Sequence, residues 1–504
     1  MHSLKLEHCP VLTRSYVHLV DEIVNRTSND EGLRRLYLEY NKFDNFDSGE
    51  MQDDLFVGLD DLEELDIRTS DVDETVIKEG AFNGLENLKS LKLTSNSIKG
   101  LPEKLFWPTP RLTSLRLQEK SVPDFPEGLF EKQRDLQRLE IQVSNAQKFH
   151  PRLFANLGKL ESLDIRDMSL FDENSIPDGI FDDLVNMKNF TLTGNGLEHS
   201  PTTLFSKTRL ENFHWSLYRC RGKNCTLHID GFFEGVSTLR TFAFESAFKV
   251  NVSLAEDIFW GSDKLERFAV DRTRIESLPR NIFRRSKKLK DISLYRNRLT
   301  TLEDGTFGGL IKLKVLILRK NQISFISNSL LRGLTQLRQL DLSNNRIRTV
   351  ESNAFASLKK LEELNLHENR VLYFNDTDQP MWSHLTGLKT LDMGGNNISL
   401  TSLPHEWSST IIGLRTLNLS DNAIGPEIEV TELKFLQNEI FVDLSRNKIT
   451  GLDFHSQALK FAKTLGPRSR GREAIQNHKY HFGRKFSQFL GNFWVIYDYY
   501  FMNP

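Results

Sequence analysis

The side chains that could do chemistry in this sequence are scattered, and none of them forms a catalytic motif. Glu140 and Asp164 could act as paired carboxylates, and His214, next to Trp215, could act as a general base. No His-Glu-x-x-His, no Gly-x-Ser-x-Gly and no phosphate-binding glycine loop occurs. We therefore expect solvated carboxylates and a surface or interface histidine, and the sequence predicts a protein that is not an enzyme.

The three cysteines are too few to indicate a metal-binding cluster. Cys220 and Cys225 are five residues apart, and we favour a small local disulfide over two reduced thiols. A zinc site would need a second group of ligands nearby, and no second cysteine pair is present. Cys9 has no evident partner. The sequence predicts no metal and no cofactor.

Seven Asn-x-Ser/Thr sequences are candidate N-glycosylation sites, which carry sugar only in a secreted chain. They are Asn25, Asn189, Asn224, Asn251, Asn375, Asn397 and Asn418. Their number favours an extracellular protein. The N-terminus argues against secretion, because residues 1–20 contain no apolar run like that of a signal peptide. No segment has the roughly 20 apolar residues of a membrane span, so we expect neither a secretion signal nor an anchor in this chain.

A tandem repeat supplies the elements that position these residues. The pattern Leu-x-x-Leu/Ile-x-Leu-x-x-Asn recurs with its asparagine at Asn297, Asn321, Asn345 and Asn369, which are 24 residues apart. This is the leucine-rich-repeat pattern, which predicts a curved solenoid. Counting apolar positions in both directions gives 17 units. The asparagine position is held by Asn41, Asn96, Asn195, Asn297, Asn321, Asn345, Asn369, Asn396, Asn422 and Asn447.

The repeat predicts an α/β solenoid, a horseshoe with a parallel β-sheet on its concave face. The Leu-x-Leu alternation is typical of a short strand with buried leucines, and the asparagines should satisfy backbone groups of the bends. A second pattern, Pro-x-x-Leu/Ile-Phe, recurs between Pro102 and Phe283. Since proline lacks a donor, we expect loops and short helical turns on the convex side, and no second sheet. The phenylalanines should be core residues.

The repeat divides the chain into three parts. Residues 1–32 form an N-terminal segment without a recognisable cap, residues 33–452 form the solenoid, and residues 453–504 form a non-repeat tail. The tail is basic and then aromatic, and we favour a loosely ordered or alternative-reading-frame extension over a membrane-binding segment. The net charge of −2 provides no overall basic field, so we expect no nucleic-acid partner.

A solenoid offers a long concave surface, so we expect binding rather than catalysis. The outward positions of the earlier strands predict a binding surface for a protein, because arginine and tyrosine favour interfaces. They are Tyr37, Glu39, Asp66, Arg68, Lys92, Arg116, Arg138, Glu140, Asp164 and Arg166. Sugar at Asn189 and Asn418 would cover later parts of the same face.

The sequence resembles the ectodomains of insect Toll and other Toll-like receptors. The resemblance rests on the Pro-x-x-Leu/Ile-Phe units, on the run from Trp407 to Asn422, and on the run from Leu433 to Ile449. It implies an extracellular or cell-surface receptor fragment that binds a cystine-knot cytokine-like protein, dimerises, and serves innate immune or developmental signalling. The alternatives are a secreted or cell-surface adhesion protein, or an intracellular scaffold of the same repeat class.

Overall fold

The structure is a computed structural model that describes much of the chain between residues 3 and 453. The described ranges are 3–7, 32–41, 50–69, 76–94, 98, 100–119, 122, 124–144, 146, 148–168, 175–194, 203–217, 226–228, 233–247, 250–371, 382–399, 411–425, 427–429, 441–448 and 451–453. Outside them lie Cys9, Cys220, Cys225, Asn25, Asn224, Asn375, Asn96 and Asn195, together with the tail from residue 454 onward.

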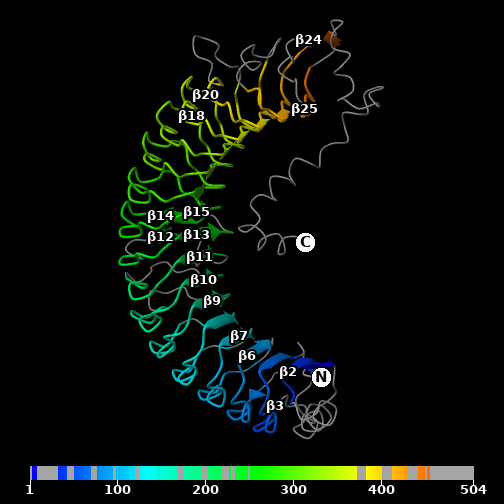
Figure 1. Ribbon diagram of the computed structural model, residues 1–504, viewed down its shortest axis with the longest axis vertical. Coiled ribbons are helices and arrows are strands. Elements are labelled where there is room, and N and C mark those ends of the chain that lie inside the picture. The colour runs from blue at the N-terminus through cyan, green and yellow to red at the C-terminus, as the bar shows by residue number, and fades with distance from the viewer. Residues whose placement is uncertain are drawn as a thin grey trace.

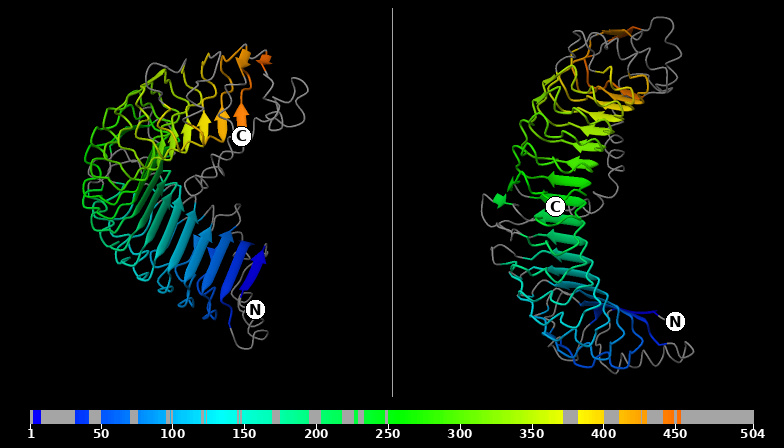
Figure 2. Two further views of the ribbon diagram at one scale, coloured as in Figure 1. Left: turned by 45° about the horizontal axis from the view of Figure 1, so that its top comes forward. Right: turned by 60° about the vertical axis from the view of Figure 1, so that its left-hand side comes forward.

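One parallel sheet of 18 strands lines the inside of a horseshoe (Figures 1 and 2). Each strand pairs with the next in chain order. The strands are β1 (Ser3–Glu7), β2 (Arg35–Asn41), β4 (Glu64–Thr69), β6 (Ser90–Thr94), β7 (Ser114–Glu119), β8 (Arg138–Val143), β9 (Ser162–Arg166), β10 (Asn189–Thr193), β11 (Asn212–Leu217), β13 (Thr241–Ser246), β15 (Arg267–Asp271), β16 (Asp291–Ser293), β17 (Val315–Ile317), β19 (Gln339–Asp341), β21 (Glu363–Asn365), β22 (Thr390–Asp392), β23 (Thr416–Asn418) and β25 (Phe441–Asp443).

The strands alternate between the core and the concave surface, as a period of two requires. In β8, for example, Leu139 and Ile141 are fully buried, whereas Arg138 is exposed and Glu140 is half-buried. The leucines of successive coils therefore form one continuous core along the solenoid. This confirms the predicted fold, a leucine-rich-repeat solenoid with a concave parallel sheet.

The outer side consists mainly of turns, and the described residues contain no helix, so the predicted short helical turns are not found there. The expectation of no second sheet on this side holds only for a continuous sheet, because short two-stranded sheets are present. Four two-stranded pairs occur, β3 (Glu50–Met51) with β5 (Val76–Ile77), β12 (Thr226–His228) with β14 (Asn251–Ser253), β18 (Phe325–Ile326) with β20 (Thr349–Val350), and β24 (Glu427–Glu429) with β26 (Gly451–Asp453). Adjacent coils at strand spacing let any extended outer segment pair with its neighbour.

The phenylalanines at the position of the second pattern, and at the same position of units that lack its proline, are core residues as predicted, and they form a stack inside the solenoid. Ring centroids of consecutive members lie 5.5–6.5 Å apart, and the stack runs through Phe56, Phe82, Phe106, Phe130, Phe154, Phe181, Phe205, Phe233 and Phe259. Their relative exposures are between 0% and 3%. These phenylalanines are therefore packing residues, and they provide a rigid support behind the concave sheet.

The repeat asparagines whose side chains are described are all hydrogen-bonded, and all are buried except Asn447, which is half-buried. These bonds confirm their structural role. Asn345 is typical: its amide nitrogen donates to the carbonyls of Leu318 and Leu342, and its oxygen accepts from the Ile323 N–H. Equivalent bonds hold Asn321, Asn369, Asn396, Asn422 and Asn447, whereas Asn297 accepts from the Thr273 hydroxyl instead. The side chain of Asn41 lies outside the described residues.

Candidate binding surface on the concave face

The register of the sheet places the ten predicted binding residues on one continuous strip across β2, β4, β6, β7, β8 and β9. The central row is formed by Tyr37, Asp66, Lys92, Arg116, Glu140 and Asp164, each paired with the next in register. The flanking rows hold Glu39 and Arg68 at one end, Arg166 at the other, and Arg138 on the opposite side of the central row. The sequence prediction of their placement on one face is thus confirmed.

The end of the strip at β8 and β9 is an ion-pair network. Arg166 Nη2 lies 2.6 Å from Asp164 Oδ2 and 3.7 Å from Glu140 Oε1. Arg116 Nη2 approaches the same Glu140 oxygen at 3.4 Å. The hydrogen bond from Arg166 to Asp164 raises the pKa of the guanidinium further above its usual range. These contacts hold two arginines and two carboxylates in a fixed arrangement, whereas isolated solvated side chains would be free to move.

The other end of the strip is a second network, centred on Glu39 and Asp66. Lys5 Nζ lies 2.8 Å from Glu39 Oε2, and its hydrogen bond to Glu39 raises the pKa of Lys5 to about 12. The same bond holds the pKa of Glu39 below its usual range. Arg68 bridges the two carboxylates, with its nitrogens 3.7 Å from Glu39 Oε1 and 3.5 Å from Asp66 Oδ1. Lys5 of β1 belongs to the strip although the sequence prediction omitted it, because β1 has no recognisable repeat motif.

Arg138 differs from the other arginines of the strip. It is exposed, and no ion pair between described residues involves it. Glu140, two residues along the same strand, faces the network described above. Arg138 therefore presents an available guanidinium, the group best suited to a carboxylate on a partner surface.

The middle of the concave face is less charged and more enclosed. His214 lies on β11 in the same row as Asp164, and burial lowers the pKa of its imidazole. Ser216 donates to Glu245 Oε1 at 2.7 Å. Burial raises the pKa of Asp271 to about 7, although its Oδ1 atom accepts from the Ser293 hydroxyl at 2.7 Å. Ser216 with Glu245, and Ser293 with Asp271, are thus hydrogen-bonded pairs on neighbouring strands.

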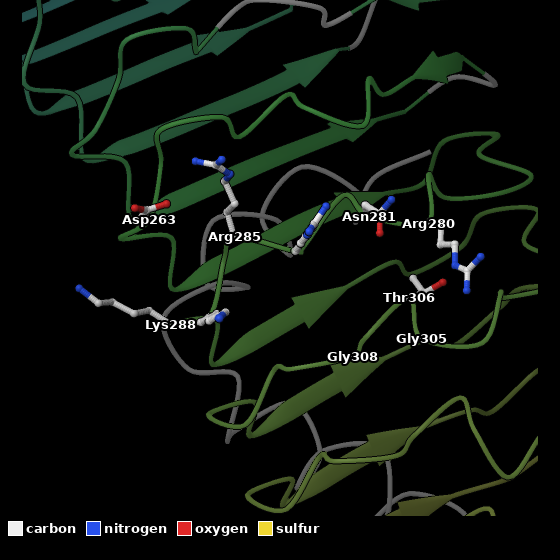
Figure 3. Close-up of a pocket in the computed structure, with 10 residues that line it drawn as sticks. Asp263, Arg280, Asn281, Arg285, Lys288, Gly305, Thr306 and Gly308 are labelled. Carbon is white, nitrogen blue, oxygen red and sulfur yellow. The ribbon is translucent and has the colours of Figure 1, made fainter.

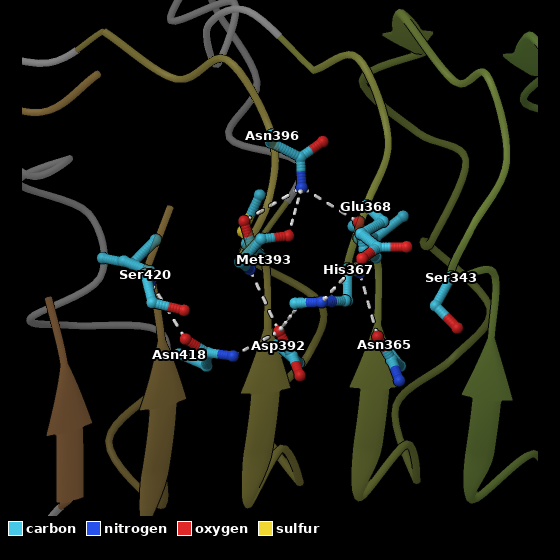
Figure 4. A network of polar contacts seen from close by, with 12 residues as sticks. Ser343, Asn365, His367, Glu368, Asp392, Met393, Asn396, Asn418 and Ser420 are labelled. Atoms are coloured by element: carbon cyan, nitrogen blue, oxygen red, sulfur yellow. Dashed lines mark hydrogen bonds and ion pairs between the residues drawn. The ribbon is translucent and has the colours of Figure 1, made fainter. Parts of the chain in front are cut away.

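The last strands carry a polar row that sequence reasoning missed (Figure 4). Asp341, Asn365, Asp392, Asn418 and Asp443 each accept a hydrogen bond from the backbone N–H two residues later. The signal was an Asp or Asn repeated at the same repeat position, two residues before a turn, which is the pattern of an Asx turn. These side chains close the strand ends, and their oxygens are used internally.

Asp392 is the most highly bonded member of this row. Its Oδ1 atom accepts from the Gly394 N–H at 3.0 Å and from Asn418 Nδ2 at 2.9 Å, and it lies 3.2 Å from His367 Nδ1. The contact with Asp392 raises the pKa of His367. This part of the concave face is therefore a bonded surface with few unsatisfied groups.

Three of the predicted glycosylation sites are compatible with the structure. Asn189 and Asn397 are exposed and Asn251 is half-buried. Asn418 lies on the concave face, as expected, but its side chain is only 7% exposed, and the amide nitrogen that would carry sugar donates to Asp392. Sugar at this atom would break a buried contact, so the prediction that Asn418 carries a glycan is corrected.

Within the described ranges, no group of three or more His, Cys, Asp or Glu side chains is placed to hold a metal ion. Among the same residues, no helix has the length and apolar character needed to span a bilayer.

Comparison with protein families agrees with this geometry. The leucine-rich-repeat family model matches residues 70–122, 263–323 and 311–371, a BspA-type leucine-rich-repeat model matches residues 124–220, and a further leucine-rich-repeat model matches residues 414–428. Together these matches span more than half of the chain, and the chain belongs to the leucine-rich-repeat proteins. No curated protein matches its sequence.

The solved structures that share the fold include Toll and a Toll-like receptor. A chain of the Drosophila Toll–Spätzle complex is 23% identical, with a TM-score of 0.74, and the match covers 89% of this chain and 58% of that one. The chain therefore spans somewhat more than half of the Toll chain. The TLR13–ssRNA13 complex matches at 20% identity and a TM-score of 0.54, over 89% of this chain and 75% of that one. A leucine-rich-repeat protein from Leptospira interrogans matches at 21% identity and a TM-score of 0.56, over 88% and 90%.

These matches confirm the resemblance to Toll-type ectodomains at the level of the fold. One neighbour was solved with single-stranded RNA, so the fold provides no support for the prediction that nucleic acid is excluded. That prediction rested on net charge alone, and a near-zero total can hide local basic regions.

Proposed function

We propose that this chain is an extracellular recognition module of the Toll type, which binds a protein ligand through the strip between β2 and β9. The observation that carries the proposal is the placement of all ten predicted residues on consecutive strands of one concave face. Long concave faces are the surfaces that solenoids use for binding. The match to the leucine-rich-repeat family and the lack of a catalytic motif in this sequence both support recognition rather than catalysis.

The two ion-pair networks support a role in specificity. Their side chains are already held by neighbours, so a partner would not have to immobilise them, and the entropic cost of binding would be small. Charges fixed in this way discriminate between partners of different charge pattern. Arg138, which lies beside the network of Arg116 and Glu140, is the group we propose to contact a carboxylate of the ligand.

The ligand that we propose is a cystine-knot cytokine-like protein, because one structural neighbour of the chain is Toll in complex with Spätzle. Receptor dimerisation, and a role in innate immunity or development, are proposed on the same basis, since the Toll–Spätzle complex is a molecular hub in both processes in Drosophila.

The test measures the affinity of Drosophila Spätzle, used as the probe, for the full chain immobilised on a sensor surface. Arg138→Glu should weaken binding at least about tenfold, since a lost charged hydrogen bond and a new repulsion add. Arg116→Glu would be a poorer test, because the new carboxylate would face Glu140 within the protein itself.

Arg134→Glu is the matched control. Arg134 belongs to the same repeat unit, is also exposed, and lies in the turn before the strand rather than on the concave face. It should bind as the unaltered chain does. If the Arg138 and Arg134 variants bind Spätzle with equal affinity, the strip is not the binding surface. If the unaltered chain does not bind Spätzle at all, the proposal of a cystine-knot ligand is wrong.

A further inference from the structure

The outer side of the solenoid carries a basic hollow, formed by Arg280, Arg284, Arg285, Lys287 and Lys288. These five cations come from the short segment 280–288 that follows Pro279, and all five are exposed. The hollow has a volume of about 690 Å³. Its residues lie in the turns that precede strand β16 and on the following coil, outside the concave strands (Figure 3).

The five cations lack acidic partners among the described residues. No ion pair or side-chain hydrogen bond in that part of the chain involves any of them, and the one acidic residue that lines the hollow, Asp263, does not pair with them. Elsewhere on the outer side, cations on neighbouring coils are matched by carboxylates, as in the contact of 2.5 Å between Lys207 Nζ and Asp182 Oδ2. The basic hollow is therefore a local excess of positive charge in a chain whose net charge is −2.

The excess extends along the solenoid. The residue directly before the first repeat leucine is Lys264, Lys288 and Lys312 in three consecutive coils, and all three are exposed. Residues at this position contact each other between coils, because Lys159 Nζ lies 2.5 Å from Asp135 Oδ1 in two earlier units. Three like charges in such a row repel one another, and a linear anion lying across the coils would relieve that repulsion.

The shape of the hollow comes from small residues on the following coil. Gly305, Thr306 and Gly308 line it there, where Asn281 and Arg284 occupy the corresponding positions one coil earlier (Figure 3). Without long side chains on that coil, the cations of the first coil have open space beside them. A chain of anionic groups could enter this space and contact several of the cations at once.

Arg285 is held by an aromatic ring. Its guanidinium carbon lies 3.7 Å from the ring centroid of Trp260, which is itself 59% exposed. This cation–π contact fixes the direction of the guanidinium. It also covers a face of the indole, and no aromatic side chain is among the residues that line the hollow. Single-stranded nucleic acids bind through bases stacked on aromatic faces, so the hollow suits an anion without bases.

We propose that the basic hollow binds a linear sulfated polysaccharide. The five unpaired cations, the row of Lys264, Lys288 and Lys312, and the lack of a stacking platform carry this assignment. Short runs rich in lysine and arginine, such as the Arg-Arg-Ser-Lys-Lys sequence at 284–288, are the sequence form of such heparin-binding patches. The proposal rests on the extracellular placement given in the proposed function, where such polysaccharides occur.

The test uses the full chain and immobilised heparin, with affinity measured over a series of salt concentrations. The variant K287S/K288S removes two cations of the hollow, and K359S/K360S removes two lysines from the same repeat positions three coils later, where both are also exposed. The first variant should bind heparin about fivefold more weakly, because two exposed ion pairs are lost. Its affinity should also depend less on salt, because fewer counterions are released. The second variant should bind as the unaltered chain does.

Both variants retain the basic residues between 468 and 485, so any contribution of the tail cancels between them. An equal effect of the two variants, or no effect of either, would overturn the proposal. So would equal or tighter binding of a single-stranded RNA or of phosphatidylserine vesicles in competition with heparin. Desulfated heparin should fail to compete. Because Arg138→Glu should leave heparin binding unchanged, failure of this proposal and failure of the ligand-binding strip give different results.

Discussion

Replacement of Asn345 by alanine tests the physical basis of the solenoid. The side chain is 8% exposed and links its own coil to the preceding one. Its amide nitrogen lies 2.9 Å from the carbonyl oxygens of both Leu318 and Leu342, and its oxygen accepts from the Ile323 N–H at 3.0 Å. Alanine removes all of these bonds at once, and the site is too enclosed for water to replace them freely.

The magnitude follows from what each partner retains. The carbonyl of Leu318 still accepts from Asn321, and the carbonyl of Leu342 still accepts from Asn369, so neither is left without a donor. The N–H of Ile323 loses its acceptor, which costs about 1–3 kcal/mol when the group is buried. With a smaller loss from the two weakened carbonyls, we expect the free energy of unfolding to fall by about 2–3 kcal/mol.

Urea unfolding followed by circular dichroism measures this loss, and amide hydrogen exchange localises it to the peptide that contains Ile323. Asn353→Ala is the control, because Asn353 is exposed and its side chain makes no hydrogen bond to another described residue; it should change stability by less than about 0.5 kcal/mol. Neither substitution should change the ligand affinity per folded molecule. An unchanged unfolding midpoint for Asn345→Ala, or unchanged protection of Ile323, would refute the reasoning.

Two further predictions concern the core and the enclosed carboxylate. Phe106→Ala should lower the free energy of unfolding by about 3–5 kcal/mol, because the ring is fully buried between Phe82 and Phe130. Phe325→Ala is the control, since Phe325 is 46% exposed. Equal losses of stability for the two variants in thermal unfolding would contradict this prediction. The folded pKa of Asp271, about 7, is above the unfolded value of about 3.9. Its contribution to stability is therefore complete below about pH 4 and is lost as pH rises through about 7. Asp271→Asn should reduce the loss of unfolding free energy between about pH 4 and pH 7, as measured by urea unfolding at each pH. Parallel pH profiles of stability for the variant and the unaltered chain would contradict this prediction.

The repeat pattern determined the fold because its information is local. A leucine at every second strand position, and an asparagine every 24 residues from Asn297 to Asn369, leave one arrangement in which all apolar rows are covered. The core phenylalanines, the buried asparagines and the alignment of the ten concave residues all follow from counting along the chain. Where the motif is weak, as in β1, counting did not find Lys5.

Only the tertiary structure decided how side chains from different coils combine. The pairing of Arg166 with both Asp164 and Glu140 depends on rotamers across the sheet, as does the burial of Asn418 beneath Asp392. A sequence pattern records the face on which a residue lies, but it does not record whether a neighbouring coil supplies a partner. For the same reason the net charge of −2 concealed the cations around Lys288, because a sum over the chain carries no information about where opposite charges fail to meet.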